Sequence, residues 1–224
     1  MQQGVRASVF VSVMMLCAAA AGSAATSPSR PATATEWRYF GGSKHFDRYA
    51  ALSQVDRASV SKLKPLWTRP GLDSSLTEEF PDLVPSNYLR GTPIIVAGVL
   101  YAPDAVGLVE AFDPLTGKTL WVQKPFEPTL KEAAGQSTRG VDFWQSGADR
   151  RIVSVRGEYL YLLDADTGAP VPEFGERGRV SLNRHTPDGA AYFGFNGPLV
   201  VGDVIVVGGN GGGKAGGGYG DGGP

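Results

Sequence analysis

The chain has 224 residues and a formal net charge of −1, with 21 lysines and arginines against 22 aspartates and glutamates. This balance gives no reason to expect a nucleic-acid or anionic-membrane partner, since such partners attract an excess of positive charge. Cys17 is the single cysteine and lies near the N-terminus, so the remainder of the chain has no disulfide and depends on its core for stability.

The first 25 residues have the pattern of a secretory signal peptide. Arg6 supplies the charged start, residues 9–21 form an apolar core, and small residues follow at 21–25. The apolar run is shorter than a membrane-spanning helix requires. We therefore expect residues 1–25 to be removed on export and the mature protein to be periplasmic.

Residues 26–35 follow as a linker rich in serine, threonine, proline and alanine, without periodicity. Ordered structure is expected to begin at Glu36. Apolar residues between 53 and 66 are spaced as in one short helical turn, which would end before Trp67.

The stretch from Pro93 to Trp121 predicts four short strands. Ala97-Gly98 lies between two β-branched runs and is typical of a tight hairpin turn. Asp113-Pro114-Leu115-Thr116-Gly117 predicts a second turn, because an Asp side chain can accept a hydrogen bond from the backbone two residues on and glycine tolerates a positive φ. Four strands joined by such turns form one small antiparallel sheet, which needs neighbours to cover it.

The same pattern returns later in the chain. Asp164-Ala165-Asp166-Thr167-Gly168 repeats the second turn, and Pro198 to Val207 repeats the first hairpin, at intervals of one and two units of about 50 residues. A four-stranded unit repeated at this spacing is typical of β-propeller blades. The alternative is a β-sandwich in which the hairpins are similar by coincidence. We predict an all-β chain with propeller architecture.

A glycine-rich run occupies residues 208–223, after the third hairpin. Gly208 to Lys214 approaches the spacing of a phosphate-binding P-loop. However, Ala215 replaces the Ser or Thr that binds the metal, and glycines follow where the motif would open a helix. We therefore expect a flexible loop leaving a strand rather than a nucleotide site.

Three segments together resemble the quinoprotein dehydrogenases that use pyrroloquinoline quinone (PQQ). Residues 37–67, from Trp37 through Gly41-Gly42 to Leu63-Lys64-Pro65-Leu66-Trp67, resemble the opening of these enzymes. Residues 111–121, Ala-Phe-Asp-x-x-Thr-Gly-x-x-x-Trp, resemble their tryptophan-docking repeat, in which Trp121 has the docking role. Residues 137–144, Ser-Thr-Arg-Gly-Val-Asp-Phe-Trp, resemble a segment that contacts the cofactor.

The resemblance extends from about Glu36 to the C-terminus. It is closer to the glucose-dehydrogenase-like branch than to the methanol-oxidising branch, which carries two adjacent cysteines just before the Arg-Gly pair. It implies an eight-bladed propeller, of which residues 36–224 would form about the first two and a half blades.

The resemblance also implies an enzyme that oxidises a hydroxyl of an alcohol, polyol or sugar. PQQ and a divalent cation, calcium, would be its cofactors, and a quinone or cytochrome c would accept the electrons. In this family the catalytic Asp and the main metal ligands come from later blades. Catalytic and metal-binding residues therefore stay unassigned, and this part of the propeller alone is expected to be inactive.

The candidate cofactor-binding residues are Arg139, Asn210, Gly211 and Gly212. Taken by itself, Arg139 at a loop-to-strand junction is typical of a solvated or ion-paired residue; the resemblance implies instead that it holds a carboxylate of PQQ. The resemblance places Asn210-Gly211-Gly212 flat against one face of the quinone, which glycine permits because it has no side chain. Gly213 stands where the methanol-oxidising branch has a metal-ligating Glu.

A rival hypothesis is a propeller that shares these repeats but acts as a binding or assembly scaffold without redox activity. Residues 137–144 favour the enzyme, because a scaffold has no need of Arg139 in that setting. Trp144 is a further candidate for the cofactor pocket, whereas His45 and His185 lie among polar residues and are expected to be solvated.

Overall fold

The computed structural model describes residues 36–50, 52–185, 191–193, 196–208 and 210–212. The chain divides into two compact units, Met1–Pro31 and Ala32–Pro224. The predicted signal peptide and linker lie outside the described residues. All the structural features below therefore belong to the second unit.

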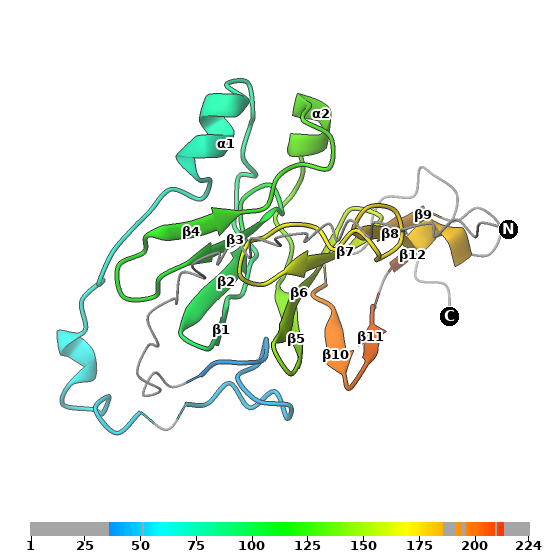
Figure 1. Ribbon diagram of the computed structural model, residues 1–224. Coiled ribbons are helices and arrows are strands. Elements are labelled where there is room, and N and C mark those ends of the chain that lie inside the picture. The colour runs from blue at the N-terminus through cyan, green and yellow to red at the C-terminus, as the bar shows by residue number, and fades with distance from the viewer. Residues whose placement is uncertain (1–35, 51, 186–190, 194–195, 209, 213–224) are drawn as a thin grey trace, which may run out of the picture. The chain divides into compact units, whose positions relative to one another are not determined.

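The first sheet has the four antiparallel strands that the sequence predicts, in the order β1-β2-β3-β4 (Figure 1). Their bounds are β1 (Ile94–Val96), β2 (Val99–Pro103), β3 (Val109–Phe112) and β4 (Thr119–Val122). Val96 pairs with Val99, and the residues between them, Ala97 and Gly98, have φ values of 49° and 75°. Two consecutive positive φ values are the mark of a type I′ hairpin, so the predicted turn is confirmed.

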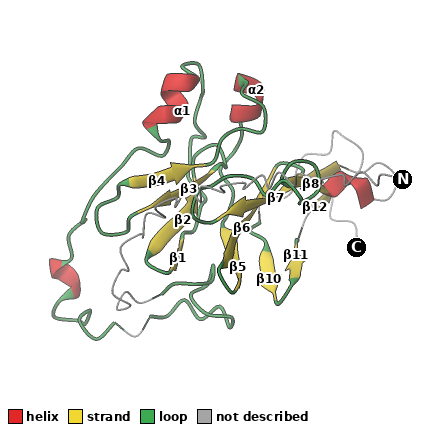
Figure 2. Ribbon diagram, in the orientation of Figure 1, coloured by secondary structure: helices red, strands yellow, loops and turns green. Residues whose placement is uncertain are grey.

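The second sheet repeats the first, with the order β5-β6-β7-β8. Its strands are β5 (Val141–Ser146), β6 (Asp149–Arg156), β7 (Tyr159–Asp164) and β8 (Arg179–Ser181). Two small antiparallel pairs follow. One is β10 (Leu199–Val201) with β11 (Val204–Val206), and the other is β9 (Ala191–Phe193) with β12 (Asn210–Gly212). Strands dominate the described part of the chain, which confirms the all-β prediction (Figure 2).

The helices are short. The 3₁₀-helix η1 (Val60–Lys62) confirms the helical turn expected before Trp67, and η2 (Leu182–His185) follows β8. The sequence did not predict α1 (Ser74–Glu79) or α2 (Leu130–Ala133). Each begins at a capping residue, since the Asp73 side chain accepts from the N–H of Ser75 and the Thr129 hydroxyl accepts from the N–H of Glu132.

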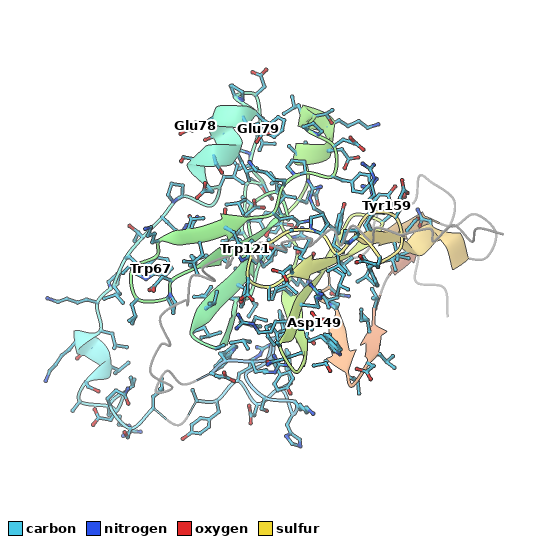
Figure 3. All side chains as sticks on the ribbon, viewed as in Figure 1. Trp67, Glu78, Glu79, Trp121, Asp149 and Tyr159 are labelled. Atoms are coloured by element: carbon cyan, nitrogen blue, oxygen red, sulfur yellow. The ribbon has the colours of Figure 1, made fainter. Side chains whose placement is uncertain are left out.

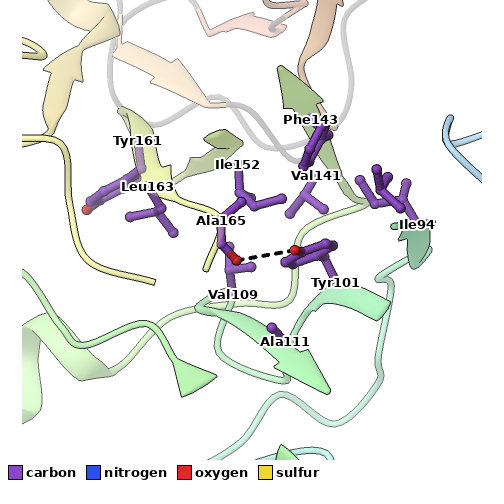
Figure 4. Packing of buried hydrophobic residues seen from close by; sticks show 11 residues of the cluster. Ile94, Tyr101, Val109, Ala111, Val141, Phe143, Ile152, Tyr161, Leu163 and Ala165 are labelled. Atoms are coloured by element: carbon purple, nitrogen blue, oxygen red, sulfur yellow. Dashed lines mark hydrogen bonds between the residues drawn. The ribbon is translucent and has the colours of Figure 1, made fainter. Parts of the chain in front are cut away.

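The core lies between the two sheets. Tyr101 is its largest fully buried side chain, and its hydroxyl donates to the carbonyl of Ala165 at 3.2 Å across the interface (Figure 4). The first sheet contributes Ile94, Val96, Tyr101, Val109 and Ala111, and the second contributes Val141, Phe143, Ile152, Tyr161, Leu163 and Ala165.

The other face of the second sheet is also covered. Val153, Val155 and Leu160 form a second apolar cluster on that sheet, against which Val200, Ile205 and Val207 of the third hairpin pack. A sheet packed on both faces by its neighbours in sequence is expected of propeller blades, whereas a sandwich buries one face of each sheet. The sandwich alternative is therefore wrong.

The predicted turns are formed identically in both sheets. One carboxylate oxygen of Asp113 accepts from the backbone N–H groups of Leu115 and Thr116. At the repeat, Asp164 does the same for Asp166 and Thr167. The closing glycines, Gly117 and Gly168, have φ values of 68° and 71°.

Each of these turns contacts a tryptophan from a segment earlier in the chain, Trp121 from β4 and Trp67 from the segment before α1 (Figure 3). Trp121 lies against Gly168 and donates from its ring nitrogen to the Ala165 carbonyl at 3.0 Å. Trp67 lies against Gly117 in the same way, and its ring nitrogen donates to the Pro114 carbonyl at 3.0 Å. The docking role predicted for Trp121 is confirmed, and Trp67 plays it for the first turn.

The outer face of the third hairpin is apolar and exposed. Leu199, Val201, Val204 and Val206 are 49–61% exposed. The register pairs Leu199 with Val206 and Val201 with Val204, so all four lie on one face. Ile205, between Val204 and Val206 in β11, packs inward on the second sheet instead.

Candidate functional site

Arg139 lies in the segment that leads from α2 into β5, the first strand of the second sheet. Two hydrogen bonds fix this segment to residues just before β1. The Ser137 hydroxyl accepts from the N–H of Arg90 at 2.9 Å, and the Arg139 carbonyl accepts from the N–H of Thr92 at 2.9 Å. Thr92 and Gly140 also form a parallel bridge. The first strands of the two sheets therefore start side by side, and both sheets hold the backbone of Arg139.

The side chain of Arg139 is exposed, and it makes no ion pair or hydrogen bond within the described ranges. The ion-pair alternative from the sequence thus has no support in this part of the chain. A guanidinium in this position can bind a carboxylate through two parallel, charge-assisted hydrogen bonds. The role of Arg139 as a PQQ ligand stays a prediction.

Asp142, in β5, fastens the strand that follows this segment to the third hairpin. Its buried carboxylate accepts from the N–H of Phe143 at 2.7 Å and from the N–H of Val200 at 2.6 Å. Burial raises the pKa of Asp142 above its usual range, although both hydrogen bonds and the positive charge of Arg38 oppose the shift. The carboxylate therefore ties β10 to β5 just beyond Arg139.

Trp144 has a structural contact instead of an open position. Its ring nitrogen donates to a carboxylate oxygen of Asp203 at 3.0 Å, in the turn between β10 and β11. This contact gives the half-buried ring a packing role beside the third hairpin. His45 is exposed, as the sequence predicts.

Asn210, Gly211 and Gly212 form β12, which pairs with β9. The sequence predicted a flexible loop here, which is wrong for these three residues, because their backbone groups take part in a ladder. Gly213 and the remainder of the glycine-rich run lie outside the described residues. The proposed contact of this strand with the quinone face therefore stays a prediction.

No group of three or more His, Cys, Asp or Glu side chains gathers as a metal site among the residues that the structure describes. The calcium predicted from the resemblance consequently receives no ligand here. In the same ranges, no helix has the length and apolar character needed to cross a membrane.

The sequence missed Arg156, at the end of β6. Its guanidinium donates to the carbonyls of Val106, Glu132, Ala133 and Ala134, at 2.8–2.9 Å. Before a glycine in a hairpin, Arg156 has the pattern of a solvated residue, so no sequence signal distinguishes it. The contacts join the second sheet to a loop of the first and to α2.

Comparison with known proteins decides the family. A family model described as the glucose/ethanol/alcohol dehydrogenase β-propeller domain, named PQQ, matches residues 37–219. The chain belongs to this family.

Relatives of this PQQ family chain include the dehydrogenase subunit of the quinone alcohol dehydrogenase of Gluconobacter oxydans (strain 621H), 31% identical over 150 residues. That match covers 66% of this chain and 18% of the relative. Quinoprotein glucose dehydrogenase A of Acinetobacter calcoaceticus is 26% identical over 199 residues, with coverages of 79% and 24%. The PQQ family chain thus spans about a fifth of the length of the first curated relatives that it matches.

Among solved structures, quinohemoprotein alcohol dehydrogenase from Comamonas testosteroni matches with a TM-score of 0.57 and 21% identity. The match covers 79% of the PQQ family chain and 23% of that structure. At this identity the likeness concerns the fold alone, and it agrees with the blade-like sheets described above.

Proposed function

We propose that this chain belongs to a PQQ-dependent oxidoreductase that oxidises a hydroxyl of an alcohol, polyol or sugar and passes the electrons to a quinone or cytochrome c. The observation that carries the proposal is the exposed guanidinium of Arg139, without an ion pair in the described ranges, in a chain of this family. The printed names of the relatives, which include quinone alcohol dehydrogenases and quinoprotein glucose dehydrogenases, support the same chemistry.

The role of this chain in that chemistry is to bind and orient. Arg139 would grip one carboxylate of PQQ, and the hydrogen bond from the N–H of Thr92 to the Arg139 carbonyl fixes the backbone from which the guanidinium extends. The strand Asn210–Gly212 would offer backbone without bulky side chains to a ring face. When bound, PQQ supplies the redox step by accepting a hydride or its equivalent from the substrate carbon.

We include a divalent cation, calcium, in the proposal because PQQ chemistry of this kind is commonly assisted by a Lewis acid. No residue that the structure describes is assigned to it, and no catalytic acid or base is assigned.

Replacing Arg139 by alanine is expected to weaken PQQ binding about 10- to 100-fold, since a charge-assisted hydrogen bond contributes about 1.5–3 kcal/mol. Arg139→Lys keeps the charge but loses the two-pronged geometry, so it should recover part of the affinity. Fluorescence titration of PQQ into the full-length apoprotein measures the dissociation constants.

Arg57→Ala is the matched control, because Arg57 is also exposed and lies outside this segment. Equal dissociation constants for the Arg139→Ala and unaltered proteins would rule out the role of Arg139. Failure of the unaltered protein to bind PQQ would favour the scaffold hypothesis.

We also propose that the protein is exported to the periplasm after cleavage near residue 25. Arg6, the apolar core of residues 9–21 and the small residues after it support this. Sequencing the N-terminus of protein recovered from the periplasmic fraction should find a start close to Thr26. Recovery with Met1 in place would refute the proposal.

A further inference from the structure

The segment that leads into β10, the first strand of the third hairpin, begins with Asn196 and Gly197. It corresponds to Arg139 and Gly140 before β5, since in both places a polar residue and a glycine precede the first strand of a unit. The two glycines are in contact, because a Cβ added to Gly197 would lie 3.3 Å from the carbonyl carbon of Gly140. Asn196 therefore lies on the segment next to that of Arg139.

Asn196 has the sequence context in which an asparagine side chain is most readily attacked by its own main chain. The backbone nitrogen of the following residue adds to the side-chain amide carbon, and a following glycine eases this ring closure because it has no Cβ. Asn196 is exposed and lies at a bend outside the strands. Within the described ranges, neither its side chain nor the N–H of Gly197 is held by a hydrogen bond. Both reacting groups are thus unengaged in this part of the chain.

The chain has a second Asn-Gly pair, Asn210-Gly211, in a different setting. It lies within β12, where Asn210 is opposite Phe193 and Gly211 is opposite Tyr192 in the ladder with β9. A ladder keeps the backbone dihedral angles near β values and so restrains the rotation that ring closure needs. The fold therefore gives two pairs of the same intrinsic chemistry different reactivity.

We propose that Asn196 is a site of spontaneous modification whose product places a negative charge beside Arg139. The backbone nitrogen of Gly197 bonds to Cγ of Asn196, and the bond from Cγ to the side-chain nitrogen breaks. The proton of the Gly197 N–H leaves with that nitrogen as ammonia, and a five-membered succinimide remains. Water then opens the ring at either carbonyl to give aspartate or isoaspartate. In total one water is consumed and one ammonia is released, without any oxidation or reduction.

The new carboxylate lies near enough to Arg139 for the two charges to interact. Arg139 and Asn196 each precede one of the two contacting glycines, so their Cα atoms are at most about 13 Å apart. This is comparable with the Debye length, roughly 10 Å at 0.1 M salt, and both side chains are exposed. A carboxylate at position 196 should attract the guanidinium and repel an anion bound to it. The modification needs only the chain itself, whereas its effect on PQQ rests on the proposed function.

Peptide mapping by mass spectrometry tests the modification. The full chain is kept folded in warm, mildly alkaline buffer, and trypsin then releases residues 185–214, one peptide that carries both Asn-Gly pairs. We expect aspartate and isoaspartate to accumulate several-fold faster at Asn196 than at Asn210. In urea, where the ladder is lost, the two rates should become similar. Equal rates in the folded protein, or no conversion at Asn196, would overturn the proposal.

Asn196→Gln is the blocking variant, because the longer side chain would have to close a six-membered ring, which forms far more slowly. Ammonia release by the folded protein should fall to a small fraction in this variant. Asn210→Gln is the matched control and should leave most of the release in place. The reverse result would assign the reaction to the strand and contradict the proposal.

Asn196→Asp imitates the aspartate product and tests the position of the new charge. The Nε–H NMR signal of Arg139, identified by its loss in Arg139→Ala, should shift in this variant, and the shift should shrink at high salt. Gln54→Glu is the control, because it also turns an exposed amide into a carboxylate and lies in a separate segment. A signal that stays in place in Asn196→Asp, or moves equally in both variants, would refute the charge contact.

Titration of PQQ into the same variants measures the consequence for binding. The dissociation constant should rise about 2- to 5-fold in Asn196→Asp, the effect of a partly screened charge, and stay unchanged in Gln54→Glu. An unchanged constant in Asn196→Asp would contradict the effect assigned to the modification. If the unaltered protein does not bind PQQ, the proposed function fails, and the peptide map and the Arg139 signal still decide the present proposal.

Discussion

Gly168→Ala is expected to destabilise the folded chain by about 2–5 kcal/mol, the sum of a backbone cost and an overpacking cost. Gly168 has a φ of 71°, which is unfavourable for an L-residue with a side chain. A Cβ added there would also overlap the indole ring of Trp121. Because that ring joins the first sheet to the second, it would have to move away from its place between them.

Gly157→Ala is the control for this substitution. Gly157 has a φ of 59° in a hairpin, but an added Cβ would meet nothing within 4 Å. It should therefore cost only the backbone term, about 1–2 kcal/mol. Urea unfolding followed by tryptophan fluorescence gives both free energies of unfolding. If the two variants lose equal stability, the Trp121 ring contributes nothing to the junction of the sheets.

The parts of this fold that sequence could predict are those fixed by chemistry within a few residues. The turns at Asp113 and Asp164 form because a carboxylate accepts two nearby N–H groups and a glycine follows, and both facts are visible in the sequence. The hairpin at Ala97-Gly98 is of the same kind. Repetition of these turns was enough to predict blades.

What escaped prediction depends on residues distant in sequence or on segments too short for periodicity. The helices α1 and α2 have six and four residues, less than two helical turns. Segments this short are too short to show the helical spacing of apolar residues in the sequence. Their caps, Asp73 and Thr129, resemble ordinary turn residues. The sequence predicted that Trp121 docks, but it did not show that Trp67 plays the same part for the first turn.

The candidate site likewise has a part that the sequence could predict and a part that only the folded chain shows. Arg139 could be selected from its surrounding motif, and the structure adds that its backbone is held by both sheets. Thr138, its neighbour, belongs to the same motif, but only the folded chain shows that its hydroxyl is buried without a partner in the described residues. Asp142 likewise has a distant partner, the N–H of Val200, that no local pattern reveals.

Arg156→Ala should destabilise the chain by about 3–5 kcal/mol, because four backbone carbonyls lose a charged donor at once. Two of these carbonyls, those of Ala133 and Ala134, stand at the end of α2, where no later turn of helix can satisfy them. A third, that of Val106, lies in a loop of the first sheet. The arginine thus replaces solvent for carbonyls on two separate elements, the loop at Val106 and the C-terminal end of α2, and alanine offers nothing in its place.

Lysine at position 156 keeps the charge but can reach fewer of these carbonyls, since its single ammonium lacks the spread of a guanidinium. Arg156→Lys should therefore recover less than half of the lost stability. The control is Arg57→Ala, an exposed site, which should change the free energy of unfolding by no more than about 0.5 kcal/mol. Urea unfolding measures all three variants. If Arg156→Ala proves as mild as the control, water satisfies the four carbonyls equally well, and the arginine is not what holds α2 against the second sheet.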